Sequence, residues 1–231
     1  MDELEKIRNR YSRRKLNQSH LLYNPLNPSV YMNVQEKEQK IIKILGENSF
    51  ADTNSQKVLE IGCGSGTNLL LFLKLGFLPE NLVGNELLEE RAEYARKILP
   101  PSTQILVGDA SQLNLPDEYF DIVYQSTVFT SILDYQFKRQ LAERMWNLTK
   151  PGGGILWYDF IYNNPKNPDV KGISIKEIKQ LFPEGEIEFW RVTLAPFISR
   201  KVTRIHPALY SVFNTLPFLR THVLCWIKKT K

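Results

Sequence analysis

Short apolar runs alternate along the chain with longer segments in which apolar residues recur at helical spacing. The clearest pair is Val58–Ile61, which is typical of a buried strand, followed by an almost entirely apolar helix pattern over residues 67–75. Strands that alternate with helices predict a mostly parallel sheet with helices on both faces, the doubly wound α/β fold. The other predicted strands cover residues 81–86, 104–107, 120–124, 155–161, 185–194 and 221–229, and the other predicted helices cover 88–99, 134–148 and 174–181.

The residues that precede this sheet are predicted to be largely helical. Residues 1–16 have apolar side chains at helical spacing, and a second helix is predicted to begin at the cap residue Asn33 and to end at Gly46. Between them, two prolines interrupt the segment 20–32, which favours a loop or lid. We therefore expect a helical leader, residues 1–50, as a candidate lid over the carboxyl edge of one sheet domain, residues 51–231.

Length and composition favour a single α/β domain. The chain has 231 residues, of which 42% are hydrophobic and 24% charged, and no break in composition suggests a second large domain. Cys63 and Cys225 give neither a disulfide framework nor a metal-ligand spacing, so no metal site is predicted. The charged start of the chain, and the lack of about 18 successive apolar residues, favour a soluble cytoplasmic protein without a transmembrane segment.

Three alternating glycines follow the first predicted strand. Gly62, Gly64 and Gly66 connect it to the helix that begins at Thr67. Glycine permits positive φ and a close approach of the backbone to a ligand, and the helix N-terminus offers free N–H groups. A dinucleotide site places its third glycine three residues after the second, whereas here the interval is two. The spacing therefore disfavours a nicotinamide-dependent oxidoreductase.

With Glu60 placed two residues before Gly62, the turn has the pattern E-x-G-x-G-x-G. This pattern resembles motif I of the class I S-adenosylmethionine-dependent methyltransferases. The phrase D-x-x-F-D at Asp117–Asp121 and the L-x-K-P-G-G-G step at Leu148–Gly154 also resemble that family. The resemblance covers residues 57–161 by motif and 162–231 by element order. It implies a Rossmann-like, seven-stranded sheet whose last strand is antiparallel, and S-adenosylmethionine as cofactor.

The predicted cofactor site lies along the ends of the first four strands. Glu86 ends the second strand, at an offset that suits a carboxylate bound to two ribose hydroxyls; capping of the helix 88–99 is the alternative. Asp109 resembles the acid that lies beside the adenine amino group, with the backbone N–H of Ala110 on a ring nitrogen; capping a turn is its alternative role. The full predicted set is Glu60, Gly62, Cys63, Gly64, Gly66, Asn85, Glu86, Asp109, Ala110 and Gln125.

The implied reaction requires an acceptor held in line with the methyl–sulfur bond, and some oxygen acceptors also need a general base. Asp159, near the end of the fifth strand, is the first candidate base, and His206 is the second. Each has a structural alternative: Asp159 as a lysine partner or turn cap, and His206 as a loop residue beside a proline.

The acceptor is predicted mainly by exclusion. Methyltransferases that act on amino groups of DNA bases typically carry Asn/Asp-Pro-Pro-aromatic after the fourth strand, where this chain has Gln125–Val128. No separate nucleic-acid module is apparent, and no acidic cluster suggests a magnesium-dependent mechanism. These points favour a small-molecule acceptor. The predicted acceptor-binding residues are Tyr23, Tyr31, Thr127, Arg200 and Arg204.

The net charge of +5 is concentrated near the C-terminus, because residues 189–231 contain eight Lys or Arg and no Asp or Glu. Such a segment suits an anionic partner. We therefore expect O-methylation of an anionic or glycan-type metabolite, with an RNA methyltransferase that uses the basic segment as a phosphate track as the alternative. The apolar residues of 209–219 form part of the core or, in the alternative, rest on a lipid surface. No pattern indicates the oligomeric state.

Overall fold

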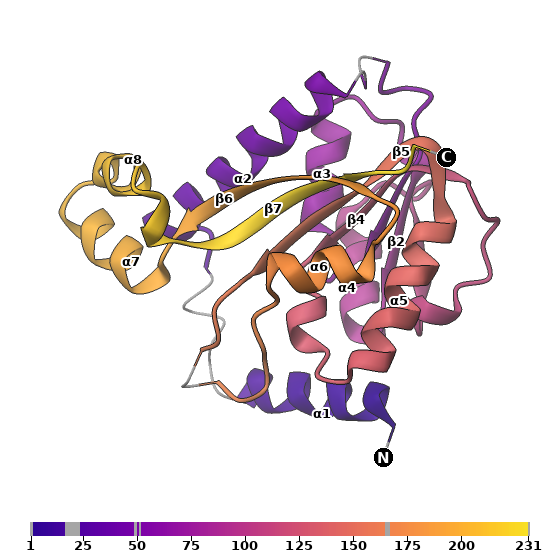
Figure 1. Cartoon of the computed structure of the whole chain (residues 1–231), viewed down its shortest axis with the longest axis horizontal. Coiled ribbons are helices and arrows are strands. Elements are labelled where there is room, and N and C mark those ends of the chain that lie inside the picture. Colours follow the sequence, from indigo (N-terminus) through magenta and orange to yellow (C-terminus); the bar gives the residue numbers. More distant parts are fainter. Residues whose placement is uncertain (1, 17–23, 49, 51, 165–166, 231) are drawn as a thin grey trace.

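A computed structural model describes residues 2–16, 24–48, 50, 52–164 and 167–230. Within this part of the chain, seven strands form one sheet in the order β3-β2-β1-β4-β5-β7-β6. The first five strands are parallel, and β7 runs antiparallel to both of its neighbours, which confirms the predicted Rossmann-like fold (Figure 1). The strands are β1 (Val58–Ile61), β2 (Leu82–Glu86), β3 (Gln104–Val107), β4 (Phe120–Ser126), β5 (Thr149–Phe160), β6 (Glu186–Leu194) and β7 (Arg220–Lys228).

Helices cover both faces of the sheet, and each face has its own apolar core. Alternate residues of β1 point to opposite faces, so that Val58 joins one cluster and Leu59 the other. Helices α2, α3 and α4 contribute to the first cluster, and α1, α5 and α6 to the second. The helices are α1 (Glu3–Leu16), α2 (Pro28–Glu47), α3 (Thr67–Lys74), α4 (Glu89–Ile98), α5 (Tyr135–Leu148), α6 (Ile175–Leu181), α7 (Pro196–Ile205) and α8 (Ala208–Asn214).

The second helix differs from the prediction. It begins at Pro28, with Asn27 as its N-cap, and so the predicted start at Asn33 is wrong. Proline has no N–H to lose at the first helical position, and there it starts a helix instead of breaking it. The buried apolar side chains of this helix are those of Ile41, Ile44 and Leu45.

The carboxyl edge of the sheet is the edge at which a ligand is expected. Strand β1 lies between β2 and β4, so that the chain leaves it in opposite directions and a crevice opens outside the carboxyl ends of these strands. Helices α7 and α8 are inserted between β6 and β7 at this same edge, because Phe160 at the end of β5 is paired with His222 near the start of β7. Figure 1 shows them as a lobe that projects beyond the sheet.

Helix α1 also lies at the carboxyl edge. Arg10 is buried, and its guanidinium donates hydrogen bonds to Glu3 Oε1 at 3.0 Å and to the carbonyl of Ser131 at 2.8 Å. Glu3 Oε1 also accepts a hydrogen bond from the N–H of Leu133. Residues 131 and 133 belong to the segment that follows β4. The buried Glu3–Arg10 ion pair of α1 is thus attached to the loop that follows β4 by one hydrogen bond between each of its two side chains and the loop backbone.

We expect Arg10→Met to lower the free energy of unfolding by about 3 kcal/mol, because it removes the buried guanidinium that is hydrogen-bonded to Glu3 and leaves only the more exposed Lys6, 3.9 Å from that carboxylate. Urea denaturation would measure the change. Arg13→Met is the matched control on the same helix: Arg13 pairs with Asp169 while its side chain is 57% exposed, so about 1 kcal/mol or less is expected. Equal losses in the two variants would contradict the structural role given to Arg10.

Candidate functional site

The glycine turn after β1 has a backbone that only glycine adopts easily. The φ angles of Gly62, Gly64 and Gly66 are 64°, 57° and 81°. The turn is also closely packed: a Cβ on Gly62 would lie 2.6 Å from Val128 Cγ2, and one on Gly64 would collide with the guanidinium of Arg91. The turn therefore lies between the loop that follows β4 and the start of α4.

The carboxylate of Glu86 holds this turn in place. Its Oε2 accepts a hydrogen bond from the N–H of Gly64 at 2.8 Å, and its Oε1 accepts one from the N–H of Leu88 at 3.0 Å. Arg91 approaches the same carboxylate at 3.9 Å. Glu86 thus makes the capping contact that was its alternative role, and it does so within contact distance of the glycine turn.

The ends of β2 and β3 carry the next group of predicted residues. Asn85 is buried, and its side-chain amide donates to the carbonyl of Gly108 at 3.1 Å. Asp109 caps the short 3-10 helix Ala110–Gln112 by accepting a hydrogen bond from the N–H of Ser111. These contacts fix the loop that follows β3 against the end of β2, beside Glu86.

A buried polar cluster, of which the prediction included only Glu60, lies on the other side of the glycine turn. Lys37 of α2 donates to Asn68 Oδ1 at 2.8 Å, and the Asn68 amide donates to Glu60 Oε1 at 2.6 Å. Glu60 is fully buried, and its Oε2 has no hydrogen-bond partner among the described residues. Burial raises the pKa of the Glu60 carboxyl and lowers the pKa of Lys37. The cluster thus holds an acceptor oxygen and a cation ready for a polar ligand.

Sequence reasoning missed Lys37, although a signal was present. Lys37 precedes the buried Ile41 by four residues and therefore points to the covered face of α2. Tyr11 was also missed as a site residue: its ring lies 5.3 Å from the guanidinium carbon of Arg91, which brings α1 beside the glycine turn.

Two predicted cofactor residues act through the backbone they support. Gln125 is fully buried; its amide donates to the carbonyl of Tyr158 and accepts from the N–H of Val128. Cys63 is 4% exposed, and its Sγ packs beside Gly84 in the core, where burial raises the pKa of the thiol. Thr127, by contrast, is half-buried and has a φ of 59° in the loop that follows β4.

The first predicted base, Asp159, lies in a buried position near the end of β5. Asp159 is completely buried, and its carboxylate accepts hydrogen bonds from the N–H and hydroxyl of Thr130 and from the N–H of Phe160. Burial raises the pKa of this carboxyl to about 7. The carboxylate is therefore enclosed by these donors and caps the segment that follows β4, and its role as a base stays a prediction.

The second predicted base, His206, takes part in a turn. It is exposed at the end of α7, where its Nδ1 accepts a hydrogen bond from the N–H of Ala208, so it serves the turn between α7 and α8. Arg200 and Arg204 belong to the same helix and Tyr31 is exposed on α2, and none of these residues joins the cluster around the glycine turn. Tyr23 lies outside the described residues.

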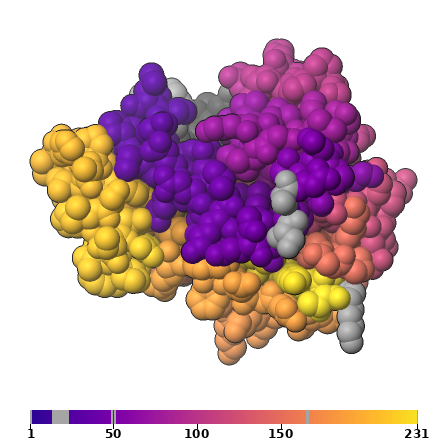
Figure 2. Space-filling model, turned by 90° about the horizontal axis from the view of Figure 1, so that it is seen from above, coloured from indigo at the N-terminus to yellow at the C-terminus, as the bar shows by residue number. Residues whose placement is uncertain are grey.

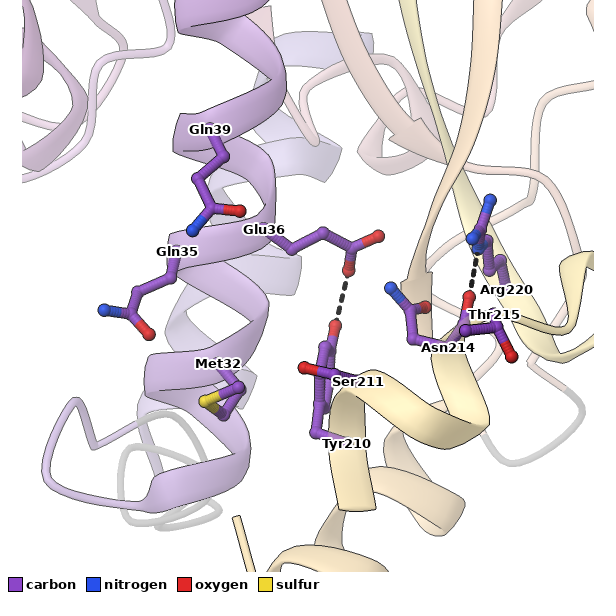
Figure 3. Close-up of a pocket in the computed structure, with 9 residues that line it drawn as sticks. All are labelled: Met32, Gln35, Glu36, Gln39, Tyr210, Ser211, Asn214, Thr215 and Arg220. Atoms are coloured by element: carbon purple, nitrogen blue, oxygen red, sulfur yellow. Dashed lines mark hydrogen bonds between the residues drawn. The ribbon is translucent and has the colours of Figure 1, made fainter. Parts of the chain in front are cut away.

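A separate cavity of about 200 Å³ opens between α2 and α8 (Figure 3). Across it the hydroxyl of Tyr210 donates to Glu36 Oε2 at 2.5 Å. The N–H of Thr193 donates to the same oxygen, and the Thr193 hydroxyl is hydrogen-bonded to the hydroxyl of Tyr158. The ring of Tyr158 lies 5.2 Å from Lys37 Nζ. The lining is mostly polar: Met32, Gln35, Glu36, Gln39, Tyr210, Ser211, Asn214, Thr215 and Arg220.

His222 lies beside this network. Its ring stacks on Tyr158 with centroids 5.0 Å apart, and burial lowers the pKa of the imidazole to about 4. No cluster of three or more His, Cys, Asp or Glu in the described part of the chain is arranged to hold a metal ion.

Comparison with known proteins points to methyltransferases. Residues 59–157 match the family model described as a methyltransferase domain. The chain is 32% identical to phosphoethanolamine N-methyltransferase 3 of Arabidopsis thaliana over 49% of its own length and 22% of that protein. It is 27% identical to the tRNA N(3)-cytidine methyltransferase METTL2 of Gallus gallus, over 59% of its own length and 39% of that protein. The chain thus spans well under half the length of these relatives.

Solved structures show the same fold. A methyltransferase from Thermotoga maritima, described as dependent on S-adenosylmethionine and as a possible histamine N-methyltransferase, superposes with a TM-score of 0.60 at 17% identity. The match covers 95% of this chain and 97% of that one. No helix in the described ranges is long and apolar enough to cross a lipid bilayer.

We expect Asp159→Asn to flatten the pH dependence of stability between pH 3.8 and about 7. The raised pKa means that the native state binds more protons than the unfolded state in this window, so the stability contributed by Asp159 is lost as pH rises. The variant should reduce that slope by up to about 1.4 kcal/mol per pH unit. Urea denaturation across the window would measure it, with the exposed Glu93→Gln as control. An unchanged slope would contradict the buried-carboxyl account.

Proposed function

Residues 59–157 form a domain of the class I S-adenosylmethionine-dependent methyltransferase family, and from that premise we propose that the chain methylates a small anionic or glycan-type acceptor, at oxygen. The observation that carries the proposal is the contact between Glu86 and the glycine turn at the carboxyl edge. It places a buried carboxylate, suited to the ribose hydroxyls of a bound adenosine, directly against the glycine turn that precedes α3.

The residues present fit S-adenosylmethionine. Glu86 would accept hydrogen bonds from the ribose, while Asn85, Asp109 and Ala110 lie along the adjacent strand ends where the adenine would be held. The cofactor supplies a methyl group already activated by its sulfonium. The protein's task is then to bind, to orient and to exclude water.

The Lys37 cluster complements the amino-acid end of the cofactor. That end carries one ammonium and one carboxylate, and the cluster offers an unpartnered carboxylate oxygen of Glu60 together with the buried cation of Lys37. Opposite charges paired in a buried site satisfy one another, whereas a misplaced charge there would be costly. We assign Lys37 to the carboxylate and Glu60 to the ammonium.

The acceptor is inferred from the groups that surround the edge. With Asp159 enclosed and His206 hydrogen-bonded in its turn, His222 is a further candidate base, and a pKa of about 4 makes it a weak one; the Glu36 carboxylate in the cavity already accepts hydrogen bonds from Thr193 and Tyr210. A neutral hydroxyl or an ammonium acceptor needs a stronger base, whereas an oxygen that is already anionic needs none, so a glycan-type acceptor would be methylated at an anionic group such as a carboxylate. The polar cavity between α2 and α8, with Arg220 in its lining, suits such an anion or a hydroxyl-rich ligand.

Methylation of RNA is the second candidate function. The acid-free segment 189–231 with its eight cations supports it, and one relative is named as a tRNA methyltransferase. An RNA substrate would bind with an affinity that falls steeply as salt increases, whereas a small acceptor would show little dependence on salt. Measuring the affinity for unmodified tRNA across a salt series separates the two.

Calorimetry with S-adenosylhomocysteine tests the proposed cofactor. We expect binding by the wild type with no binding of NAD, and a loss of affinity of roughly tenfold or more in Glu86→Ala, because charged hydrogen bonds to the ribose are removed. Glu93→Ala, an exposed carboxylate on α4, is the control. Binding of NAD instead, or an affinity unaffected by Glu86→Ala, would overturn the assignment.

Lys37→Met tests the amino-acid end separately. We expect roughly a tenfold to hundredfold loss of affinity for S-adenosylhomocysteine and little change for 5′-methylthioadenosine, which lacks the amino-acid group. Lys40→Met is the matched control, since Lys40 on the same helix lies over Trp190 at 4.1 Å. An equal loss for both ligands would mean that Lys37 only supports the fold.

A further inference from the structure

The segment from α7 to the 3-10 helix η5 (Pro217–Leu219) forms a lobe whose surface carries many apolar side chains. This α7–η5 lobe, residues 196–219, projects at one end of the molecule and lies against α2 (Figures 1 and 2). Ile205 is 79% exposed, Phe218 70% and Phe197 64%. The exposed large apolar side chains of the lobe are those of Phe197, Ile205, Val212, Phe213, Leu216 and Phe218.

The inner side of the lobe packs against the rest of the protein. Val202 and Tyr210 form a small core with Leu194, and Met32 of α2 packs against it. The Tyr210 hydroxyl accepts from the N–H of Leu194 and donates to Glu36. The inner side of the lobe is therefore packed against α2 and the end of β6. Its outer apolar side chains stay exposed in the described part of the chain. Monomeric proteins seldom expose apolar residues so densely unless another surface covers them.

Cations are interleaved with these apolar residues. On α7, Lys201, Arg204 and Ile205 follow Phe197 by four, seven and eight residues, so all four share one face of the helix. None of the cations of α7 (Arg200, Lys201 and Arg204) forms an ion pair with a described residue, and no Asp or Glu occurs between 189 and 231. The covering surface must accordingly be both apolar and negatively charged.

We propose that the α7–η5 lobe docks on an anionic membrane surface. A helix with this mixture of side chains lies in the interface, with its apolar groups at the acyl boundary and its Lys and Arg on anionic headgroups. A single-stranded nucleic acid is the weaker match. Its bases would stack on Phe197 and Phe218, whereas the aliphatic Ile205, Val212 and Leu216 offer no stacking surface.

Docking in this way orients the candidate site. The lobe emerges at the carboxyl edge of the sheet, the edge that also carries the glycine turn and α1. A docked molecule therefore presents that edge to the membrane, and an amphipathic acceptor reaches it from the lipid surface. The docking itself does not depend on methyl transfer.

Co-sedimentation with vesicles tests the proposal, using phosphatidylcholine alone and phosphatidylcholine mixed with phosphatidylserine. We expect the wild type to bind the anionic vesicles at least roughly tenfold more tightly than the neutral ones. Two double variants, Ile205→Ser with Phe218→Ser and Lys201→Glu with Arg204→Glu, should each lose roughly tenfold or more of this binding. The matched control is Tyr94→Ser with Lys97→Glu, an exposed aromatic and cation on α4.

The proposal would be overturned if the wild type bound no vesicles, or if both lobe variants bound them as well as the wild type. It would also be overturned if the wild type bound no vesicles but formed a dimer in sedimentation velocity, and the variant Ile205→Ser with Phe218→Ser were monomeric. Binding to single-stranded RNA that needs the cations but not Ile205, with no vesicle binding, would favour the nucleic-acid alternative. Calorimetry with S-adenosylhomocysteine on every variant shows whether the variant still folds, so that a loss of vesicle binding can be assigned to the docking surface. Vesicle binding by a wild type that fails to bind this ligand would leave the docking intact and refute the proposed function alone.

Discussion

The hydrogen bond between the Glu86 carboxylate and the N–H of Gly64 is the contact on which the candidate site depends. It spans from the end of β2 to the turn that follows β1, and the second carboxylate oxygen fixes the start of α4 through Leu88. A carboxylate buried to 4% exposure is stable only when its oxygens are bonded, and here backbone donors satisfy both of them. The same bonds hold the turn in its positive-φ conformation. One side chain thereby positions two strand ends and a helix around the crevice at the reversal of strand order.

The other side of the glycine turn is organised by charge. Lys37 comes from a helix that precedes the sheet in sequence, and Asn68 from the helix that follows the turn, yet the two meet at Glu60 through two hydrogen bonds. Burial disfavours the charged form of both ionisable groups, which is why their pKa values move towards each other. Such a cluster is costly for stability and suits a ligand that itself carries both charges.

The basic residues near the C-terminus lie in two different parts of the structure. Arg200 and Arg204 belong to α7 in the projecting lobe, whereas Arg220 lines the cavity between α2 and α8. The cations are therefore divided between an inner polar cavity and an outer surface that is also apolar. Under the two proposals, this division would separate the recognition of a small acceptor from the contact with a membrane surface.

The sequence by itself determined the sheet, its seven strands and the glycine turn, because period-two and helical patterns and the E-x-G-x-G-x-G spacing are local properties of the chain. It also indicated Glu86 and Glu60, which lie at fixed offsets from that turn. Only the tertiary structure decided the surroundings of Asp159, His206 and Lys37, since these depend on which distant groups pack around each side chain. Asp159 is enclosed by Thr130, His206 serves a turn, and Lys37 reaches Asn68 across 31 positions of sequence. Burial and long-range contacts leave no local signature, so the groups that would perform chemistry were the least predictable part of the molecule.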